Sequence, residues 1–522
     1  MNDNNTLSFF ALRNRWIAIF VLILSAAVVP VVTYSLVEHP PEYDELLHVL
    51  AARGIEKTGE PVIEDGRYAR AEIYTRLVSL TAGLHEDELI AARLPAIFFT
   101  ILLAGLIGYW LTRNVGWLAG LVAALVLVIA PATINLAVIV RFYTFHALAV
   151  TLLIILLYEA SKPDRGAGFR LLVAAFSVAL GWLAFQLHDI TMITIGATAA
   201  GLTYLTLYRF RRVYLPTVTK YPVLTTIFVL LAFVVFVAGA WASGLIGLLR
   251  QSAPVWSQPL ANYPGFYLAR LGSQMPFIWP LFPVMAVAAF FHNRRLAGYL
   301  LSIIVVAFVA NSIAAQKATR YIYHIFPLIC IVWGIGFQAL ILAISNYFSQ
   351  KYRLISTIST SLILVLAFTC VLSTMEFRRM VKLVLGRPLI NDAVHLGEEP
   401  DWIAAKSVID PLLPDIDRVI ASSGFKSLHA FGRYSYELHT TVIAETDTGD
   451  EFGVDGRTGK QVISSADSVS HVIEMPGNEL FVLEERMINE PHGANSQVME
   501  VIENRCSILP LPSVIGVKAW QC

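Results

Sequence analysis

Charged residues are scarce in this sequence. They make up 15% of its 522 residues, whereas hydrophobic residues make up 56%. A soluble protein carries about 25% charged residues, so this chain lacks the polar surface to face water on all sides. The shortage is confined to residues 1–380, which are mostly long apolar runs, while residues 390–522 have an ordinary globular composition. The change of composition near Gly386 predicts two domains, residues 1–384 and 385–522.

The chain also lacks the marks of several other protein classes. Its formal net charge is zero, which argues against a nucleic-acid binder, because neutralising phosphates requires clustered Lys and Arg. No P-loop or dinucleotide-binding motif occurs in its required context, and His-Glu-x-x-His is incomplete, which disfavours nucleotide-driven activity and a zinc protease. Of the four cysteines, Cys330 and Cys370 lie in apolar runs and are expected to be buried. Cys506 and Cys522 have no metal-like spacing and would pair if their domain faces an oxidising compartment.

Long apolar runs predict about eleven transmembrane helices. A bilayer core requires about 20 apolar residues in helical form. The first run is too long for the h-region of a signal peptide, so we expect a membrane anchor. The runs are residues 16–37, 94–111, 117–134, 144–158, 171–185, 190–207, 223–249, 276–291, 297–314, 321–344 and 354–375.

The distribution of Lys and Arg in the loops predicts the orientation, because cytoplasmic loops carry an excess of basic residues. With the N-terminus in the cytoplasm, the inner loops hold fourteen basic residues and the outer short loops hold five. The inner set is Arg13, Arg15, Arg113, Lys162, Arg165, Arg170, Arg209, Arg211, Arg212, Lys220, Arg294, Arg295, Lys351 and Arg353. The outer set is Arg141, Arg250, Arg270, Lys317 and Arg320. The N-terminus is therefore predicted to be cytoplasmic and the C-terminal domain extracytoplasmic, in the inner or plasma membrane of the cell.

The first outer segment, residues 38–93, contains an acidic pair, Asp44 and Glu45. Residues 42–57 have helical spacing with an apolar side, and we expect this helix to lie along the membrane surface. A carboxylate at that interface can act as a general base on an acceptor hydroxyl. The alternative is that the pair only solvates or caps the helix.

The five outer basic residues depart from the charge bias and so require a compensating role. Guanidinium groups clamp phosphate through paired donors, and Lys acts as a point charge. Such residues at the interface would suit an anionic lipid head, although each alone is also explained as a snorkelling anchor. The neighbouring aromatics, among them Tyr143 and Tyr321, are equally explained by an interfacial aromatic belt.

Short motifs on the predicted outer side resemble those of a known family. They are Asp44-Glu-Leu-Leu-His48, Gly66-Arg-Tyr-Ala-Arg70, Tyr74, Ala92-Arg-Leu-Pro95, Val140-Arg-Phe-Tyr143, and Lys317-Ala-Thr-Arg-Tyr321 followed by His324 and Pro327. Their order along the chain is similar to that in the GT-C glycosyltransferases, in particular the family-39 branch with protein O-mannosyltransferases and the aminoarabinose transferase of lipid A. The resemblance covers residues 16–375 in topology.

The resemblance implies a mainly α, GT-C-like membrane domain and an inverting glycosyltransferase. The enzyme would move a sugar from a polyprenyl-phosphate donor to a lipid, glycan or protein acceptor at the outer face of the membrane. Asp44 would be the catalytic base, and Glu45 would support it or bind substrate. The substrate-binding residues would be Arg70, Glu72, Tyr74, Arg141, Tyr143, Arg270, Lys317, Arg320, Tyr321 and His324.

The sequence departs from the family at one point. Several relatives carry a second acidic residue in the loop that matches residues 135–141, and this chain has none there. Glu72 or Asp189 would have to substitute for it. Phosphate departure can be stabilised by cationic side chains without a metal, so no cofactor is required, and a divalent metal is permitted but not indicated.

The C-terminal domain alternates strand-like and helix-like patterns. Residues 418–423, 470–475 and 479–484 are predicted to be strands, and residues 402–413, 484–489 and 495–503 to be helices. These patterns predict a small extracytoplasmic α/β domain with an accessory role.

Two other functions remain open on the sequence. A polysaccharide polymerase or ligase also works outside the cell, but usually places its functional loop late in the chain. A lipid or solute transporter would show an internal repeat and charged residues deep within its spans, and neither is evident.

Overall fold

The computed structural model describes residues 41–220, 263–351, 400–438, 452–490, 493–511, 514 and 516–522. The predicted spans at residues 16–37, 223–249 and 354–375 lie outside these residues, as do Arg250 and Cys370. The chain divides into two compact units. The helical unit comprises Met1–Thr33, Ile97–Ala137 and Tyr143–Leu385; the sheet unit comprises Tyr34–Ala96, Val138–Phe142 and Gly386–Cys522. The first outer segment thus groups with the C-terminal domain.

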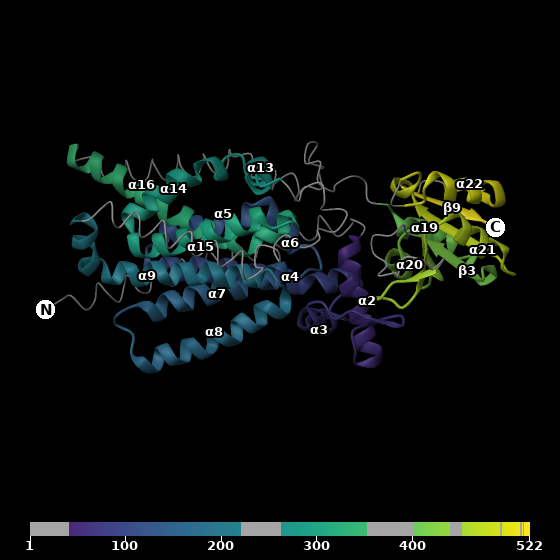
Figure 1. The fold of residues 1–522 in the computed structure, drawn as a ribbon, viewed down its shortest axis with the longest axis horizontal. Coiled ribbons are helices and arrows are strands. Elements are labelled where there is room, and N and C mark those ends of the chain that lie inside the picture. Colours follow the sequence, from purple (N-terminus) through teal and green to yellow (C-terminus); the bar gives the residue numbers. More distant parts are fainter. Residues whose placement is uncertain are drawn as a thin grey trace. The chain divides into compact units, whose positions relative to one another are not determined.

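Long apolar helices build the helical unit (Figure 1). Their sequences are apolar around most of the helix surface, as is typical of helices that contact both neighbours and lipid. Helix α9 packs on α15, α14 and α5 on α16, and α7 on α8. The elements are α4 (Glu88–Asn114), α5 (Trp117–Ile129), α6 (Pro131–Ala137), α7 (Tyr143–Ser161), α8 (Ala167–Leu187), α9 (Thr191–Lys220), α13 (Phe266–Gln274), α14 (Ile278–His292), α15 (Arg294–Ile313), η2 (Thr319–Ile325) and α16 (Phe326–Lys351).

Within the described residues, five helical segments are long and apolar enough to cross a membrane: Glu88–Asn114, Tyr143–Ser161, Ala167–Leu187, Arg294–Ile313 and Thr319–Asn346. Two bent helix pairs bring this number to seven if each is one span. The chain is therefore a multi-pass membrane protein. The predicted span at residues 190–207 lies in α9, which is long enough but, with its threonines, is not among these segments.

One bent pair replaces a predicted straight span, and the other places a helix before one. The span expected at residues 117–134 is broken at Ala130, and α5 and α6 meet there at 66°. Pro131 begins α6 because its ring fixes φ and it has no N–H to donate to the preceding turn. The span expected at residues 276–291 is α14, which follows α13 at an angle of 103°.

The sheet unit begins with two helices and two short strands of the first outer segment and continues in the C-terminal domain. In the described part of this unit, one sheet has seven strands in the order β5-β6-β4-β3-β7-β9-β8. The four strands β6, β4, β3 and β7 are parallel, and β5, β9 and β8 are antiparallel to their neighbours. The elements are α2 (Tyr43–Thr58), β1 (Val62–Ile63), β2 (Gly66–Arg67), α3 (Glu72–Thr81), α19 (Trp402–Ile409), η3 (Leu413–Asp415), β3 (Arg418–Ala421), α20 (Gly424–Phe431), β4 (Tyr436–Leu438), β5 (Phe452–Val454), β6 (Gln461–Ile463), α21 (Ala466–Glu474), β7 (Glu479–Glu484), η4 (Glu485–Met487), α22 (Ser496–Arg505), β8 (Ser507–Leu509) and β9 (Val517–Gln521).

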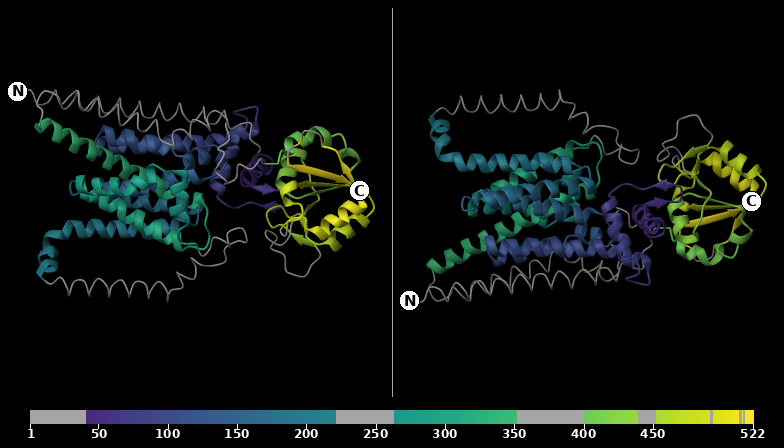
Figure 2. Two further views of the ribbon diagram at one scale, coloured as in Figure 1. Left: turned by 90° about the horizontal axis from the view of Figure 1, so that it is seen from above. Right: turned by 90° about the horizontal axis from the view of Figure 1, so that it is seen from below.

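Helices cover both faces of this sheet (Figure 2). Alternation along the strands explains why, because successive side chains of a strand point to opposite faces. On one face Val419 and Val482 pack with residues of α19 and α20, while on the other Ile420 and Phe481 pack with residues of α21 and α22. The predicted α/β domain is confirmed as a mixed sheet between two helical layers.

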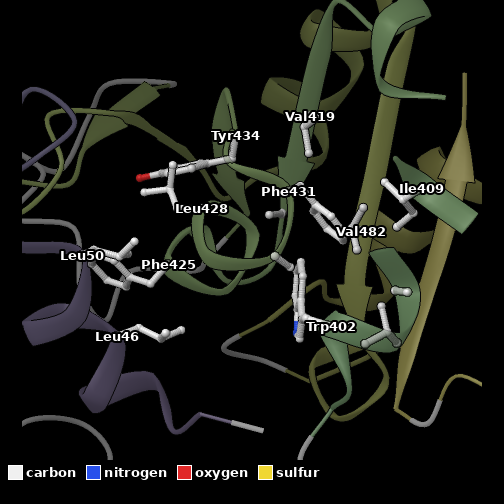
Figure 3. Packing of buried hydrophobic residues seen from close by; sticks show 14 of the residues in the cluster. Leu46, Leu50, Trp402, Ile409, Val419, Phe425, Leu428, Phe431, Tyr434 and Val482 are labelled. Atoms are coloured by element: carbon white, nitrogen blue, oxygen red, sulfur yellow. The ribbon is translucent and has the colours of Figure 1, made fainter. Parts of the chain in front are cut away.

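Helix α2 differs from its prediction. Its apolar side was expected to lie along the membrane surface, but Leu46 and Leu50 are buried in the core of the sheet unit. Figure 3 shows both leucines beside Phe425 of α20. The apolar face of a helix can be buried against lipid or against protein, and the sequence pattern is the same in both cases.

Three further details of the C-terminal domain were open or incorrectly predicted. Residues 470–474 form the end of α21 rather than a strand, because Ser465 and Ser468 make a capping box and Val469 and Val472 repeat at helical spacing. Residues 484–489 form only the short turn η4. Cys506 and Cys522 form a disulfide beside the paired strands β8 and β9.

Candidate functional site

The acidic pair lies in the first turn of α2. Glu42 precedes the helix and forms a capping box with Glu45: the Glu45 side chain accepts a hydrogen bond of 3.0 Å from the Glu42 backbone N–H. Negative charge is favourable here because the first backbone N–H groups of a helix have no intrahelical acceptor. The helix start thus fixes where Asp44 and Glu45 emerge.

Glu45 is fully engaged inside the sheet unit. Its side chain is 1% exposed and accepts two hydrogen bonds of 3.0 Å from Nε and Nη2 of Arg93. The backbone N–H of Val140 donates a further bond of 2.8 Å to Oε1. A paired carboxylate of this kind joins three segments that lie far apart in the sequence, α2, α4 and residues 138–142.

Asp44 has a different environment from that of its neighbour. Its side chain remains 29% exposed, and Oδ2 lies 3.1 Å from Nη2 of Arg141. Arg141 is 2% exposed and also donates to the backbone carbonyl of Asp44 over 3.1 Å. The acidic and basic residues singled out from the sequence are therefore in contact, and only the acid is accessible.

Aromatic side chains surround His48, one helical turn beyond Asp44. Its Nδ1 lies 2.9 Å from the Thr75 hydroxyl, and its ring meets Tyr68 and Tyr74 edge-to-face at 5.2 Å. Burial lowers the pKa of His48 well below its ordinary value, and Arg141 and Arg70 lower it further. The imidazole is therefore neutral. It packs against the aromatic rings and forms a hydrogen bond with Thr75.

The remaining predicted residues of the first outer segment lie at differing depths. Tyr74 is fully buried, and burial raises the pKa of its hydroxyl. Arg70 is exposed, with its guanidinium 5.7 Å from the centre of the Phe142 ring. Glu72 lies on the surface between Arg76 at 2.7 Å and Arg67 at 3.4 Å.

A second group of predicted residues meets in the helical unit. The ring of His188 lies 5.8 Å from Tyr143, 5.4 Å from Tyr321 and 6.0 Å from His146. His146 in turn lies 6.0 Å from His324, whose Nδ1 is 2.9 Å from the Tyr321 carbonyl. Helix α7, the turn after α8 and η2 thus supply one cluster of imidazole and phenol groups.

The helical unit also contains three predicted cationic residues, Lys317, Arg320 and Arg270. Lys317, between α15 and η2, is 1% exposed and donates to the carbonyls of Ser312 and Ala314, and burial lowers its pKa. Arg320 packs over Tyr321 at 5.7 Å. Arg270 lies half-buried on α13.

Sequence reasoning omitted three residues that organise these groups. Arg93 was recognised only as part of a motif, although a charge at the entry of an apolar run requires a partner. His146 and His188 were not predicted, because nothing in the sequence brings α7, α8 and η2 together. Among the described residues, no group of three or more His, Cys, Asp or Glu side chains is placed to hold a metal ion.

Comparison with solved structures identifies the architecture. The chain superposes on ArnT from Cupriavidus metallidurans in the apo state with a TM-score of 0.62 and 14% identity, over 96% of this chain and 97% of that one. The chain has the GT-C fold. ArnT bound to undecaprenyl phosphate gives a TM-score of 0.57 at 13% identity, over 99% and 98% of the two chains.

The GT-C fold is also shared with a more distant enzyme. The archaeal oligosaccharyltransferase AglB from Archaeoglobus fulgidus, in complex with an inhibitory peptide and a dolichol-phosphate, matches with a TM-score of 0.56 and 11% identity. That match covers 91% of this chain and 70% of AglB. No protein-family model and no curated protein matches the sequence. The GT-C resemblance predicted from short motifs is therefore confirmed by the fold.

Proposed function

We propose that this protein transfers a sugar from a polyprenyl-phosphate donor to an acceptor at the outer face of the membrane. The observation that carries the proposal is the match to ArnT over nearly the whole of both chains, including a structure of ArnT bound to undecaprenyl phosphate. With the segments outside the described residues, the chain would have about eleven spans, a cytoplasmic N-terminus and an extracytoplasmic C-terminal domain.

Asp44 is the proposed catalytic base. Its carboxylate takes the proton of the acceptor hydroxyl while the oxygen attacks the anomeric carbon of the donor sugar. The bond from that carbon to the phosphate oxygen breaks, and its electron pair leaves with the polyprenyl phosphate, so the anomeric configuration is inverted. The partial exposure of Asp44 supports this role, because a base must reach the acceptor.

Glu45 is proposed to position Asp44 rather than to react. Its oxygens already accept hydrogen bonds from Arg93, Val140 and Glu42. For the leaving phosphate we propose Arg141, Lys317, Arg320 and Arg270, because cationic donors stabilise the charge that develops on it. Tyr143, Tyr321 and His324 would contact the donor sugar, and Arg70, Glu72 and Tyr74 the acceptor side.

The proposal is tested by reconstituting the protein in liposomes with labelled undecaprenyl-phosphate sugars and a mixture of lipid and peptide acceptors. We expect the wild type to release undecaprenyl phosphate and Asp44→Asn to lose at least about 100-fold in rate, the usual contribution of a general base. Glu56→Gln, an exposed acid on the same helix, is the matched control and should keep its rate. Full activity in Asp44→Asn would exclude this residue as the base.

The cationic residues are tested by donor binding rather than by rate. We expect Arg320→Ala and Lys317→Ala to weaken binding of undecaprenyl phosphate, measured by native mass spectrometry in detergent, whereas Arg505→Ala on the C-terminal domain should not. Unchanged binding in both variants would remove these residues from the proposed phosphate site.

A further inference from the structure

One of the contacts between the C-terminal domain and the first outer segment is made by the turn of residues 455–460, which joins β5 and β6. The backbone N–H of Asp65 donates to the Thr458 carbonyl over 3.0 Å, and Lys460 lies 3.2 Å from Glu64. Gly66 lies so close to this turn that a Cβ there would be 2.3 Å from the Arg457 carbonyl carbon. The turn and the β1–β2 hairpin are thus packed backbone to backbone.

Arg457 projects from this turn in a fixed orientation. Asp455, 1% exposed, accepts hydrogen bonds of 2.8 Å from Nε and 2.9 Å from Nη2 of Arg457. Two parallel bonds of this kind fix a guanidinium in direction as well as in distance. The guanidinium carbon Cζ of Arg457 lies 4.8 Å from the centre of the Phe425 ring and 5.6 Å from the centre of the Tyr43 ring.

Tyr43 is the first residue of α2 and directly precedes Asp44. Its ring meets Phe425 edge-to-face at 5.0 Å, so Arg457 and Phe425 contact it together. The remainder of α2 is held to the same domain by Leu46 and Leu50 (Figure 3). A shift of Arg457 would therefore displace Tyr43 and, with it, the helix turn that carries Asp44.

We propose that Arg457, held by Asp455, is a positioning residue for Asp44 and that the C-terminal domain thereby completes the reactive site. This inference rests on the proposed function. A displacement of about 1 Å in a reacting group can reduce a rate by about 100-fold, which is why a residue remote from the chemistry can matter to it. The C-terminal domain is then a working part of the enzyme rather than an accessory.

Steady-state kinetics in liposomes test the proposal. We expect Arg457→Ala to lower kcat by 10- to 100-fold with an unchanged KM for the lipid donor, because the donor contacts assigned above do not include Arg457. Arg457→Lys keeps the charge but loses the paired bonds and should recover only part of the rate. Arg505→Ala, which breaks an exposed ion pair with Glu474 on the same domain, should behave as wild type.

A double-mutant cycle with Tyr43 identifies the route of the effect. Tyr43→Ala should lower kcat as Arg457→Ala does, and the double variant should be little worse than either, because both remove the same contact. Additive losses, or an unchanged kcat in Arg457→Ala, would overturn the proposal.

Hydrogen exchange separates this inference from the proposed function. In Arg457→Ala and Arg457→Lys, the hydrogen-bonded amides of α2 from Glu45 onward should exchange faster while those of α22 are unchanged, whether or not the protein transfers sugars. If wild type transfers no sugar, the proposed function fails and the positioning role fails with it, but exchange still decides whether Arg457 holds α2. Unchanged exchange in both variants would exclude that contact as a restraint.

Discussion

In the sheet unit, the buried Glu45 carboxylate accepts paired hydrogen bonds from the buried Arg93 guanidinium. In the helical unit, the comparable buried contact joins an imidazole and a hydroxyl, with Nε2 of His146 2.8 Å from the Thr191 hydroxyl. A second pair of buried contacts shows the same difference, an ion pair in the sheet unit and a hydrogen bond without an ion pair in the helical unit. The sheet unit buries a Lys426–Glu484 pair at 3.0 Å, whereas in the helical unit the Tyr299 hydroxyl donates to the Ile154 carbonyl over 3.0 Å.

The difference follows from the surroundings of each unit, which are lipid for the membrane-spanning helices and water for the sheet unit. A charge in the hydrocarbon core costs several kcal/mol and is kept only where it is functional. Among the described residues of the helical unit, Lys317 is the only Asp, Glu, Lys or Arg side chain that is buried. The sheet unit can bury full charges because their partners are supplied by neighbouring segments of protein. Four experiments would test this contrast between the units.

The strongest test is to break the Glu45–Arg93 pair. Glu45→Gln leaves a buried guanidinium without its counter-charge and should lower the free energy of unfolding by about 3–5 kcal/mol. Protection of α2 amides in hydrogen exchange measures it. Adding Arg93→Gln should recover part of the loss, and Glu56→Gln on the exposed side of the helix should cost little. A loss below about 1 kcal/mol would mean that buried charge does not hold this unit together.

The second test is the pH dependence of the sheet unit. Burial raises the pKa of the Glu437 carboxyl to about 7 from near 4.5; Arg457 opposes the rise and Asp455 adds to it. The native state keeps this proton where the unfolded chain has lost it, so stability falls from pH 4.5 to 7 and stays lower above. The loss amounts to about 3 kcal/mol.

Glu437→Gln should therefore raise the melting temperature in detergent at pH 8 and leave it nearly unchanged at pH 4.5. An equal pH dependence in this variant and in the wild type would show that another group is responsible.

The third test removes the covalent restraint of the sheet unit. Cys506 and Cys522 are 16 residues apart, and closing a loop of that length stabilises a domain by about 3 kcal/mol. The double serine variant should melt at a lower temperature and be insensitive to dithiothreitol, whereas reductant should lower the melting temperature of the wild type. Identical melting of oxidised and reduced wild type would contradict this.

The smallest effect is expected in the helical unit. Thr191→Val leaves the buried His146 nitrogen without its partner, which should cost about 1–2 kcal/mol in detergent-induced unfolding. Thr203→Val, an exposed position on the same helix whose hydroxyl bonds only the Ala199 carbonyl, is the control. A cost as large as that of Glu45→Gln would remove the contrast between the units.

The class of the molecule follows from the composition of its amino-acid sequence. A shortage of charge and long apolar runs predicted a membrane protein, because hydropathy depends on composition over about 20 residues and not on distant contacts. The apolar alternation in the C-terminal domain predicted its α/β character. Short motifs around Asp44, Arg141 and Lys317 predicted the GT-C fold, which the structure confirms.

The tertiary structure alone decided what each charged and apolar side chain contacts. From the sequence, Asp44 and Glu45 were one acidic pair; in the structure, Glu45 is buried on Arg93 and Asp44 remains accessible on Arg141. The apolar side of α2 is buried against α20, although the sequence fitted a membrane surface equally well. Such outcomes depend on which distant segments meet, and residues 44, 93, 141 and 457 are brought together only by folding.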